Sequence, residues 1–302
     1  MNIKKITHLF LTVALLSSCE FNEDFCIRDG VLFATCDYSR IQPGMKIDPT
    51  SQHLIGYGRS DQTQPFSPVA DFVKDTLEWS APQGNYGFIL YSGSHGYSIN
   101  NRERMEICSA LAEIDTLNGK RYYAKDMPLL SYGIFSEKLV YQKPVYRDIV
   151  MKPLTQQLIV KLHLQGNQLE MLDSIKSEID GVYSAKTFTS EIPSGESATV
   201  KMVYQKADSD KKLWEGTSYV LGFSDTDKNI FRLFTKTSNN SDEFHELDLS
   251  PYLKGITQYK IIVNLDFTVG KELEINDPVV VESWSTGEKI EIEITPEKSG
   301  NQ

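Results

Sequence analysis

The chain has 302 residues, and its 31 basic and 41 acidic side chains give a formal net charge of −10. This acidic balance argues against a nucleic-acid binder, because such a protein needs Lys and Arg to neutralise phosphates. Hydrophobic residues make up 40% of the chain, which is enough to build real cores and excludes wholesale disorder. Four cysteines are too few for a disulfide scaffold. The length predicts about two domains.

The first 19 residues have the pattern of a bacterial lipoprotein signal peptide. Lys4 and Lys5 form a positive region, and an apolar run follows from Ile6 to Leu16. This run is too short to span a membrane, which takes roughly 20 apolar residues. It ends in Leu16-Ser17-Ser18-Cys19, which matches the lipobox, where the Cys receives the lipid. We therefore expect residues 1–18 to be removed and Cys19 to carry acyl chains such as palmitate, which together anchor a protein stably.

Residues 19–28 form an acidic tether between this anchor and the folded part. The cluster Glu20-Phe21-Asn22-Glu23-Asp24 resembles the export tag of surface lipoproteins in Bacteroidota, and it is equally compatible with a solvated leader. No later segment of the sequence is apolar enough to span a membrane. The sequence therefore predicts a soluble body on a lipid tether at the outer membrane, exposed on the cell surface.

Beyond the tether the dominant hydrophobic period is two, which is typical of strands with one face on a core. The strongest predicted strands are Tyr259–Val269, Leu158–Leu164 and Ile290–Ile294, in which apolar and polar residues alternate. Weaker strands are predicted at Val31–Tyr38, Phe72–Trp79, Tyr86–Tyr91, Glu106–Thr116, Tyr141–Lys152, Thr199–Tyr204, Ser218–Phe223, Ile230–Thr235 and Phe244–Leu249.

Turn-forming Gly, Pro and Asn separate these segments at short intervals, which favours an all-β fold of two tandem β-sandwiches. The segment Leu169–Ile179 has apolar residues at helical spacing, yet part of it also alternates as a strand would, and both readings stay open. The best boundary lies in Pro128–Pro144. We therefore expect an N-terminal sandwich domain over residues 29–140 and a C-terminal one over 141–302.

No catalytic group is evident in the sequence. Ser92-Gly93-Ser94-His95-Gly96 lacks the G-x-S-x-G pattern of a hydrolase elbow and predicts a glycine-rich turn. Asp225–Asn229 resembles the opening of a calcium loop, but Ile230 replaces the required Gly and Lys236 the bidentate Glu, so a polar hairpin tip is expected. The histidines lack metal-ligand spacing; they are His53, His95, His163 and His245. We expect no enzyme, no metal and no cofactor.

The remaining cysteines and the tryptophans have structural interpretations. Cys26 and Cys36 could close a short disulfide loop, and we expect Cys108 to be a buried thiol. Trp79, Trp214 and Trp284 each lie in or beside a predicted strand. This placement favours core packing over a platform for stacking sugars.

Several stretches of the chain together resemble a known family. In the first half these are Val31–Tyr38 followed by Gln42-Pro43-Gly44-Met45, and Gly84–Tyr91. In the second half they are Lys143-Pro144-Val145-Tyr146, Leu158–Leu162, and Leu169–Val182 with its Asp180-Gly181 turn. With the lipobox and the acidic spacer, they resemble the fimbrillin superfamily, and more closely the FimB-type minor fimbrial subunits and anchor lipoproteins of Bacteroidales.

This resemblance implies transthyretin-like sandwich domains and a structural role in assembling or attaching a type V-like pilus. Its implied partners are other fimbrial subunits, joined by exchange of a strand that completes a neighbour's sheet. The late strands Val279–Trp284 and Ile290–Ile294 could serve this joining or could complete their own sandwich, and both readings stay open. An alternative function is that of a surface glycan-binding lipoprotein, which should expose three or more coplanar aromatic rings at one end.

Overall fold

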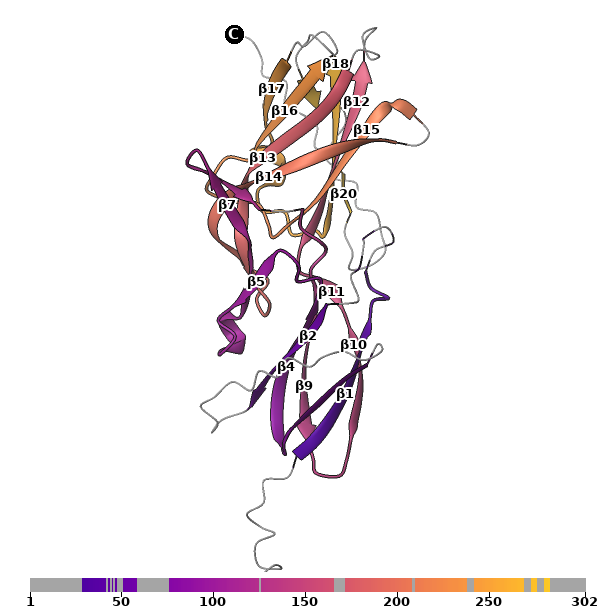
Figure 1. The fold of residues 1–302 in the computed structure, drawn as a ribbon, viewed down its shortest axis with the longest axis vertical. Helices are drawn as coiled ribbons and strands as arrows, with labels where there is room; N and C mark the ends of the chain where they lie inside the picture. The colour runs from indigo at the N-terminus through magenta and orange to yellow at the C-terminus, as the bar shows by residue number, and fades with distance from the viewer. Residues whose placement is uncertain are drawn as a thin grey trace, which may run out of the picture.

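A computed structural model gives the fold of the chain. It describes residues 29–41, 43, 45, 47, 51–58, 76–124, 126–165, 172–207, 210–237, 242–268, 273–275 and 280–282. The predicted signal peptide, Cys19 and the tether lie outside these residues, as do Cys26, Trp284 and Ile290–Ile294. The described part is almost entirely β, which confirms the predicted fold class. Figure 1 shows an elongated molecule in which β1 begins at one end and β16 to β18 lie at the other.

Two small sheets form the lower part of the molecule in Figure 1. The first has the order β10-β1-β3, with β1 (Asp29–Asp37), β3 (Thr76–Pro82) and β10 (Val145–Val150). The second has the order β11-β9-β4-β2, with β2 (Gln52–Gly58), β4 (Gly84–Ser92), β9 (Ser131–Leu139) and β11 (Lys152–Pro153). Trp79 of β3 packs edge-on against Phe88 of β4 at 5.1 Å between ring centroids, so the two sheets share one core.

A larger sheet forms the upper part, with the main order β17-β16-β13-β14-β15-β12-β18-β19. This sheet curls back on itself, because His245 of β17 packs against Phe267 of β18 at 4.9 Å. One helical turn, α2 (Ser250–Leu253), follows β17. The strands are β12 (Gln156–Gln165), β13 (Leu172–Thr187), β14 (Pro193–Ala207), β15 (Asp210–Val220), β16 (Ile230–Thr237), β17 (Asp242–Asp248), β18 (Lys260–Thr268), β19 (Leu273–Ile275) and β20 (Val280–Glu282).

An excursion between β4 and β9 connects the two parts. It contains β5 (Tyr97–Asn100), the 3₁₀ turn η2 (Met105–Ile107), β6 (Ser109–Ala112), β7 (Ile114–Leu117) and β8 (Lys120–Tyr123). Within the excursion, β6 pairs with β13, and β8 pairs with β14. Conversely, β10 pairs with β1, and β11 pairs with β9. Strand pairing therefore crosses the expected division at 140/141 in both directions, and the division into two domains stays a prediction.

Each part contains one parallel pair between an early strand and a late strand. Leu32–Asp37 of β1 align with Val145–Val150 of β10, and Gln157–Gln165 of β12 align with Lys260–Thr268 of β18. A parallel pair cannot be joined by a tight hairpin, so other strands of the same part lie between its two members in the sequence. The two parts thus share a topological motif although no repeat is visible in the sequence.

Several predicted elements are confirmed, and others need correction. The predicted strands Leu158–Leu164 and Tyr259–Val269 are confirmed as β12 and β18. The ambiguous segment Leu169–Ile179 belongs to strand β13 from Leu172 onward. The predicted strand Glu106–Thr116 is wrong as one element, because η2 and two short strands divide it. The predicted boundary Pro128–Pro144 contains β9, whose residues Ser131–Leu139 pair with β4 throughout. Its two prolines lie outside the strand and therefore do not break it.

Gly133 in the middle of β9 is required by close packing. A Cβ atom there would lie 2.4 Å from Cγ2 of Ile149, which belongs to the neighbouring strand β10 and is buried. A Cβ atom at Gly84, at the start of β4, would meet only ordinary van der Waals contacts, the nearest at 3.5 Å from the Tyr86 ring. Close packing therefore excludes a side chain at one glycine and permits it at the other.

We expect Gly133→Ala to lower the free energy of unfolding by roughly 1–3 kcal/mol, because the added methyl group overpacks the space beside Ile149. Gly84→Ala is the matched control and should stay within about 0.5 kcal/mol of the wild type. Chemical denaturation followed by circular dichroism measures both. Equal effects of the two substitutions would contradict the packing argument.

Candidate functional site

The serine-rich segment considered for catalysis is a turn, as predicted. Ser92–Gly96 leads from β4 into β5, and Gly93 and Gly96 have φ angles of 78° and 83°. His95 is exposed, whereas Ser92 is buried and its Oγ lies 2.8 Å from Oγ of Ser131. Ser92 therefore belongs to a buried hydroxyl pair that links neighbouring strands.

The other candidates from the sequence are also structural. Cys108 is a buried free thiol, as predicted, and Cys36 is a half-buried free thiol. Asp225–Asn229 lies in the connection between β15 and β16, where residues 225–228 are exposed. Within the described ranges, no group of three or more His, Cys, Asp and Glu side chains is arranged to hold a metal ion. Among the same residues, no helix has the length and apolarity needed to cross a membrane.

The tip of the β13–β14 hairpin, residues Phe188–Glu191, is the feature that joins the two parts of the molecule. The hairpin reaches from the upper part down to the level of β5 and β11 (Figure 1). The Phe188 side chain is fully buried between the rings of Tyr91 on β4 and Tyr132 on β9, at 5.7 and 5.6 Å between ring centroids. The Phe188 N–H also donates to the Cys108 carbonyl oxygen at 3.0 Å. The hairpin tip is thus inserted into the lower part.

Glu191 supplies the polar half of this contact. Its Oε1 accepts hydrogen bonds from Tyr132 Oη at 2.7 Å and from Lys152 Nζ at 2.5 Å, and its Oε2 accepts one from Tyr259 Oη at 3.1 Å. Burial raises the pKa of Glu191, but the bonds from Lys152 and Tyr132 outweigh burial and hold the pKa below its usual value. Glu191 is therefore a charged clasp that connects β9, β11 and the residue before β18.

Lys186 is a buried cation beside this clasp. It lies in β13, pairs with Ala110 of β6, and is only 5% exposed. Burial lowers its pKa to about 8, the charge of Glu191 partly opposes that shift, and the charge of Lys152 adds to it. Sequence reasoning missed Phe188, Lys186 and Glu191, because their contacts come from segments far apart in the chain. The only local signal is a large apolar residue, Phe188, at a hairpin turn.

The edge of the upper sheet bears on the predicted joining segment. The outer side of β18 pairs with β19 at Leu265–Phe267 and with β20 at Lys260–Ile262. Val280–Glu282 therefore completes the chain's own sheet. For that stretch, this pairing favours completion of its own sandwich over joining to another subunit. The rest of the segment, including Ile290–Ile294, lies outside the described residues.

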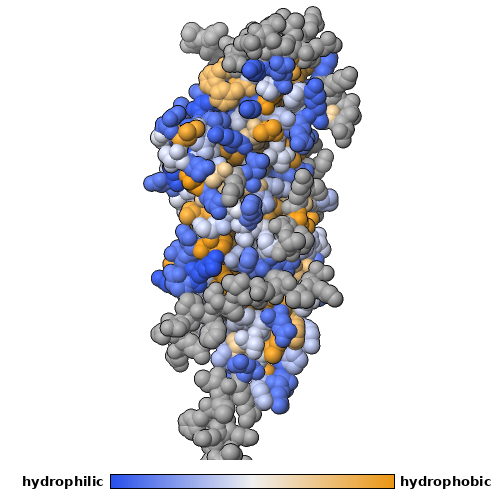
Figure 2. Space-filling view, in the orientation of Figure 1, coloured by the Kyte–Doolittle hydropathy of each residue, from blue (hydrophilic) through white to orange (hydrophobic). Residues whose placement is uncertain are grey.

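Exposed aromatic rings are few in the part of the chain that the structure describes. Phe234 and Phe244 form one exposed pair, with centroids 5.3 Å apart and planes tilted by 47°. Figure 2 shows a light orange patch at the upper end of the molecule, over β16 and β17. Tyr146 is exposed in the lower part and stacks on Phe33. Three coplanar exposed rings at one end are not found among the described residues, and Trp79 and Trp214 are buried, as predicted.

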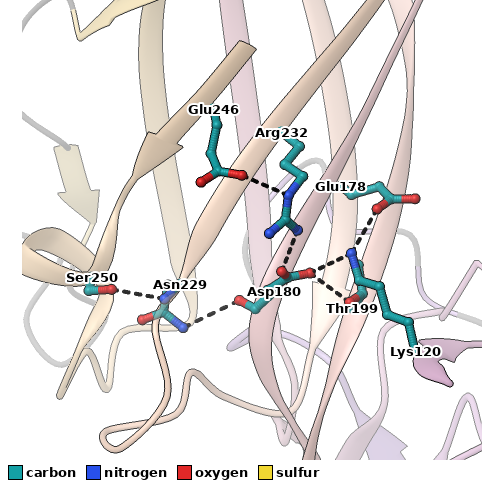
Figure 3. Close-up of polar contacts among 8 residues, drawn as sticks. All are labelled: Lys120, Glu178, Asp180, Thr199, Asn229, Arg232, Glu246 and Ser250. Carbon is teal, nitrogen blue, oxygen red and sulfur yellow. Dashed lines mark hydrogen bonds and ion pairs between the residues drawn. The ribbon is translucent and has the colours of Figure 1, made fainter. Parts of the chain in front are cut away.

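A polar cluster on β13 lies next to the aromatic pair. Asp180 accepts hydrogen bonds from Thr199 Oγ1 at 2.7 Å and from Arg232, and it forms an ion pair with Lys120 Nζ at 2.9 Å (Figure 3). Burial raises the pKa of Asp180, but the bonds from Thr199 and Arg232 outweigh it and leave the pKa lowered. Lys120 comes from β8, so this cluster also ties the excursion to the upper sheet.

Comparison with known proteins finds the same architecture among solved structures from Bacteroides. No protein-family model matches the chain, and no curated protein matches its sequence. The fold is shared with a candidate adhesin from Bacteroides ovatus, at a TM-score of 0.56 and 12% identity, over 85% of this chain and 95% of that one. It is also shared with a candidate polysaccharide-binding protein from Bacteroides thetaiotaomicron, at a TM-score of 0.52 and 13% identity, over 84% and 96% of the two chains.

The fimbrial anchor protein Mfa2 from Porphyromonas gingivalis is a further structural match. Its TM-score is 0.47 at 10% identity, and the match covers 84% of this chain and 97% of that one. The candidate adhesin and the candidate polysaccharide-binding protein thus share the fold of this chain, which agrees at the level of the fold with the resemblance drawn from the sequence.

We expect Glu191→Gln to lower the free energy of unfolding by roughly 1–3 kcal/mol, because it removes the charge that Lys152, Tyr132 and Tyr259 stabilise. Glu196→Gln is the matched control, since Glu196 pairs with Arg121 but its side chain is 84% exposed. Urea denaturation should show almost no change for the control. A Glu191→Gln protein as stable as the wild type would disprove the role of the clasp.

Lys186→Met should stabilise the protein at pH 7 by roughly 1–3 kcal/mol, because it removes a buried charge and keeps an unbranched side chain of nearly the same length. The pKa of Lys186 is about 8 when folded against 10.5 as the ordinary value. Between these pH values the unfolded state binds more protons, so this group makes the wild type more stable as pH rises. The advantage of the variant should therefore shrink between pH 7 and pH 10. An advantage that is constant with pH would contradict the assignment.

Proposed function

We propose that this chain is a lipid-anchored surface protein with a structural, non-enzymatic role in adhesion or in a fimbria, resembling a minor or anchor subunit. The observation that carries this proposal is the elongated all-β architecture, which two solved adhesin-like or binding proteins share over at least 84% of this chain. The lipobox at Leu16–Cys19 supports the anchor. An elongated body suits a protein that holds a partner away from a surface.

The proposed anchor lies at one end of the long axis. The described chain begins at Asp29 in β1, at the lower end of the molecule, and the upper sheet lies at the opposite end (Figure 1). A lipid on Cys19, connected through the acidic tether of residues 19–28, would attach this lower end to the outer membrane. The upper sheet would then be the part farthest from the membrane and the first to meet a partner.

Joining to other fimbrial subunits would proceed by strand exchange. Because Val280–Glu282 already pairs with β18, the exchanged segment would have to begin after Glu282. Ile290-Glu291-Ile292-Glu293-Ile294 has the alternation that strand addition requires, with apolar side chains for pockets and carboxylates for water. The proposed donor strand is therefore residues 290–294.

Glycan binding is the second candidate function. One structural neighbour is described as a candidate polysaccharide-binding protein, and the pair Phe234 and Phe244 offers an exposed aromatic surface. The 47° tilt between these rings suits a flat sugar ring less well than a coplanar platform would. The structural role therefore remains the preferred proposal.

Fractionation of producing cells tests the anchor. Cys19→Ala should move the protein from the membrane fraction to the soluble fraction, because the acyl chains are lost.

Two truncations test the joining segment. Deletion of residues 283–302 should leave a folded protein, because β20 is kept, and this protein should no longer copurify with fimbrial subunits, because the proposed donor strand is lost. Deletion of residues 279–302 also removes β20 and should in addition lower stability.

Three results would contradict the proposal. A Cys19→Ala protein that stays in the membrane with an acyl label would disprove lipidation at this residue. Copurification that survives deletion of residues 283–302 would exclude this segment as the donor strand. Binding of a purified glycan, with no fimbrial partner recovered, would favour the second function.

A further inference from the structure

The outer face of the upper sheet carries an exposed apolar row. We define this face by the side chains of β17, β16, β13 and β14 that point away from the core. One cross-strand row on it is Phe244, Phe234, Lys176 and Val203, aligned by the strand register. Phe244 is 56% exposed, Phe234 38% and Val203 68%. Large apolar groups gathered at this exposure mark an interaction surface.

The next row along the same strands is charged. It consists of Glu246, Arg232, Glu178 and Lys201, again aligned by the register of the four strands. Arg232 Nε donates to Glu246 Oε2 at 3.0 Å, and Lys120 Nζ donates to Glu178 Oε2 at 2.9 Å (Figure 3). These bonds hold the carboxylates in place. The four side chains of the row therefore alternate in sign as negative, positive, negative and positive. Beside the row, Lys120 of β8 adds a second cation next to Glu178, and the Tyr122 ring lies 4.1 Å from Nζ of Lys201.

This order of charges is self-complementary. A two-fold axis parallel to the strands and above the face would place β17 of one copy over β14 of the other, and β16 over β13, with equal rows aligned. Glu246 would then face Lys201 of the second copy, and Arg232 would face Glu178. In the apolar row, Phe244 would face Val203, and Phe234 would face Lys176, a cation over an aromatic ring. Glu246 and Lys201 would form an ion pair, the aromatic and aliphatic side chains would bury one another, and Arg232 would share Glu178 with Lys120.

We propose that the outer face of β17, β16, β13 and β14 is the interface between two copies of this chain in a symmetric dimer. Charge complementarity selects a second copy as the occupant. When a row of four alternating charges is laid over its own reverse, each charge faces one of opposite sign. Sheets also pack face to face with their strands nearly aligned, which this axis provides.

The axis has a consequence for two anchored copies. Rotation about a line parallel to the strands leaves strand direction unchanged, so both lower ends point the same way. Two copies tethered to one membrane could therefore pair side by side without detaching. Only this point rests on the proposed function, whereas the dimer itself does not require the lipid.

Cysteine trapping in membranes of cells that produce the full chain tests the proposed arrangement. The double variant Phe244→Cys/Val203→Cys should form a disulfide-linked dimer. Within one copy these residues are three strands apart, or about 14 Å, which is too far for a disulfide. Either single variant and the wild type, which retains Cys26, Cys36 and Cys108, should give at least about tenfold less dimer. Tyr146→Cys/Phe244→Cys is the matched control with one position on another sheet, and it should resemble the single variants.

Charge reversal tests the pairing independently of oxidation. In sedimentation of the detergent-solubilised protein, Glu246→Lys and Lys201→Glu should each raise the dimer dissociation constant about tenfold, and the two together should restore most of the affinity. Glu78→Lys on β3 is the control and should leave it unchanged. Circular dichroism checks that each variant is folded. A wild type that stays monomeric at every concentration, equal trapping of single and double variants, or reversal without rescue would each overturn the proposal.

Discussion

The carboxylate of Glu191 is the constraint on which the relative position of the two parts depends. A half-buried charge is costly unless several donors satisfy it, and this one accepts hydrogen bonds from Tyr132, Lys152 and Tyr259. Those donors come from β9, from β11 and from the residue that precedes β18. Tyr132 and Lys152 belong to the lower sheets and Tyr259 to the upper part, so their bonds to one carboxylate hold the two parts in the observed arrangement.

Apolar packing and strand pairing reinforce the same arrangement. Phe188 fills the space between Tyr91 and Tyr132, and the excursion from β5 to β8 adds strands of the first half to the upper sheet. Lys120 at the start of β8 then enters the Asp180 cluster, so the excursion is tied by charge as well as by backbone. Without these contacts, only the short passage from β11 to β12 would join the parts. The elongated shape is therefore a property of the side chains at the junction as much as of the sandwiches.

The sequence predicts those features that depend on local alternation. β12 and β18 could be recognised because one face of each is apolar throughout, and Cys108 and Trp79 could be placed in cores for the same reason. β9 was missed because Gly133 and the flanking prolines resemble loop residues, although Gly133 is required by contact with Ile149 of another strand. Glu191 could not be recognised, since its environment is built from residues distant in the chain. Alternation reports which face of a strand is buried, but it does not report what covers that face.

In each part, an early strand has a parallel partner that comes much later in the chain. β1 is synthesised first, yet its partner β10 begins at Val145, and β12 must wait until Lys260 for β18. The excursion ending at Tyr123 likewise waits for β14. Contacts of such long sequence separation carry a large loop-closure entropy and form slowly. A chain that emerges N-terminus first would therefore hold open strand edges until nearly all of it has appeared, and those edges would be exposed to aggregation until then.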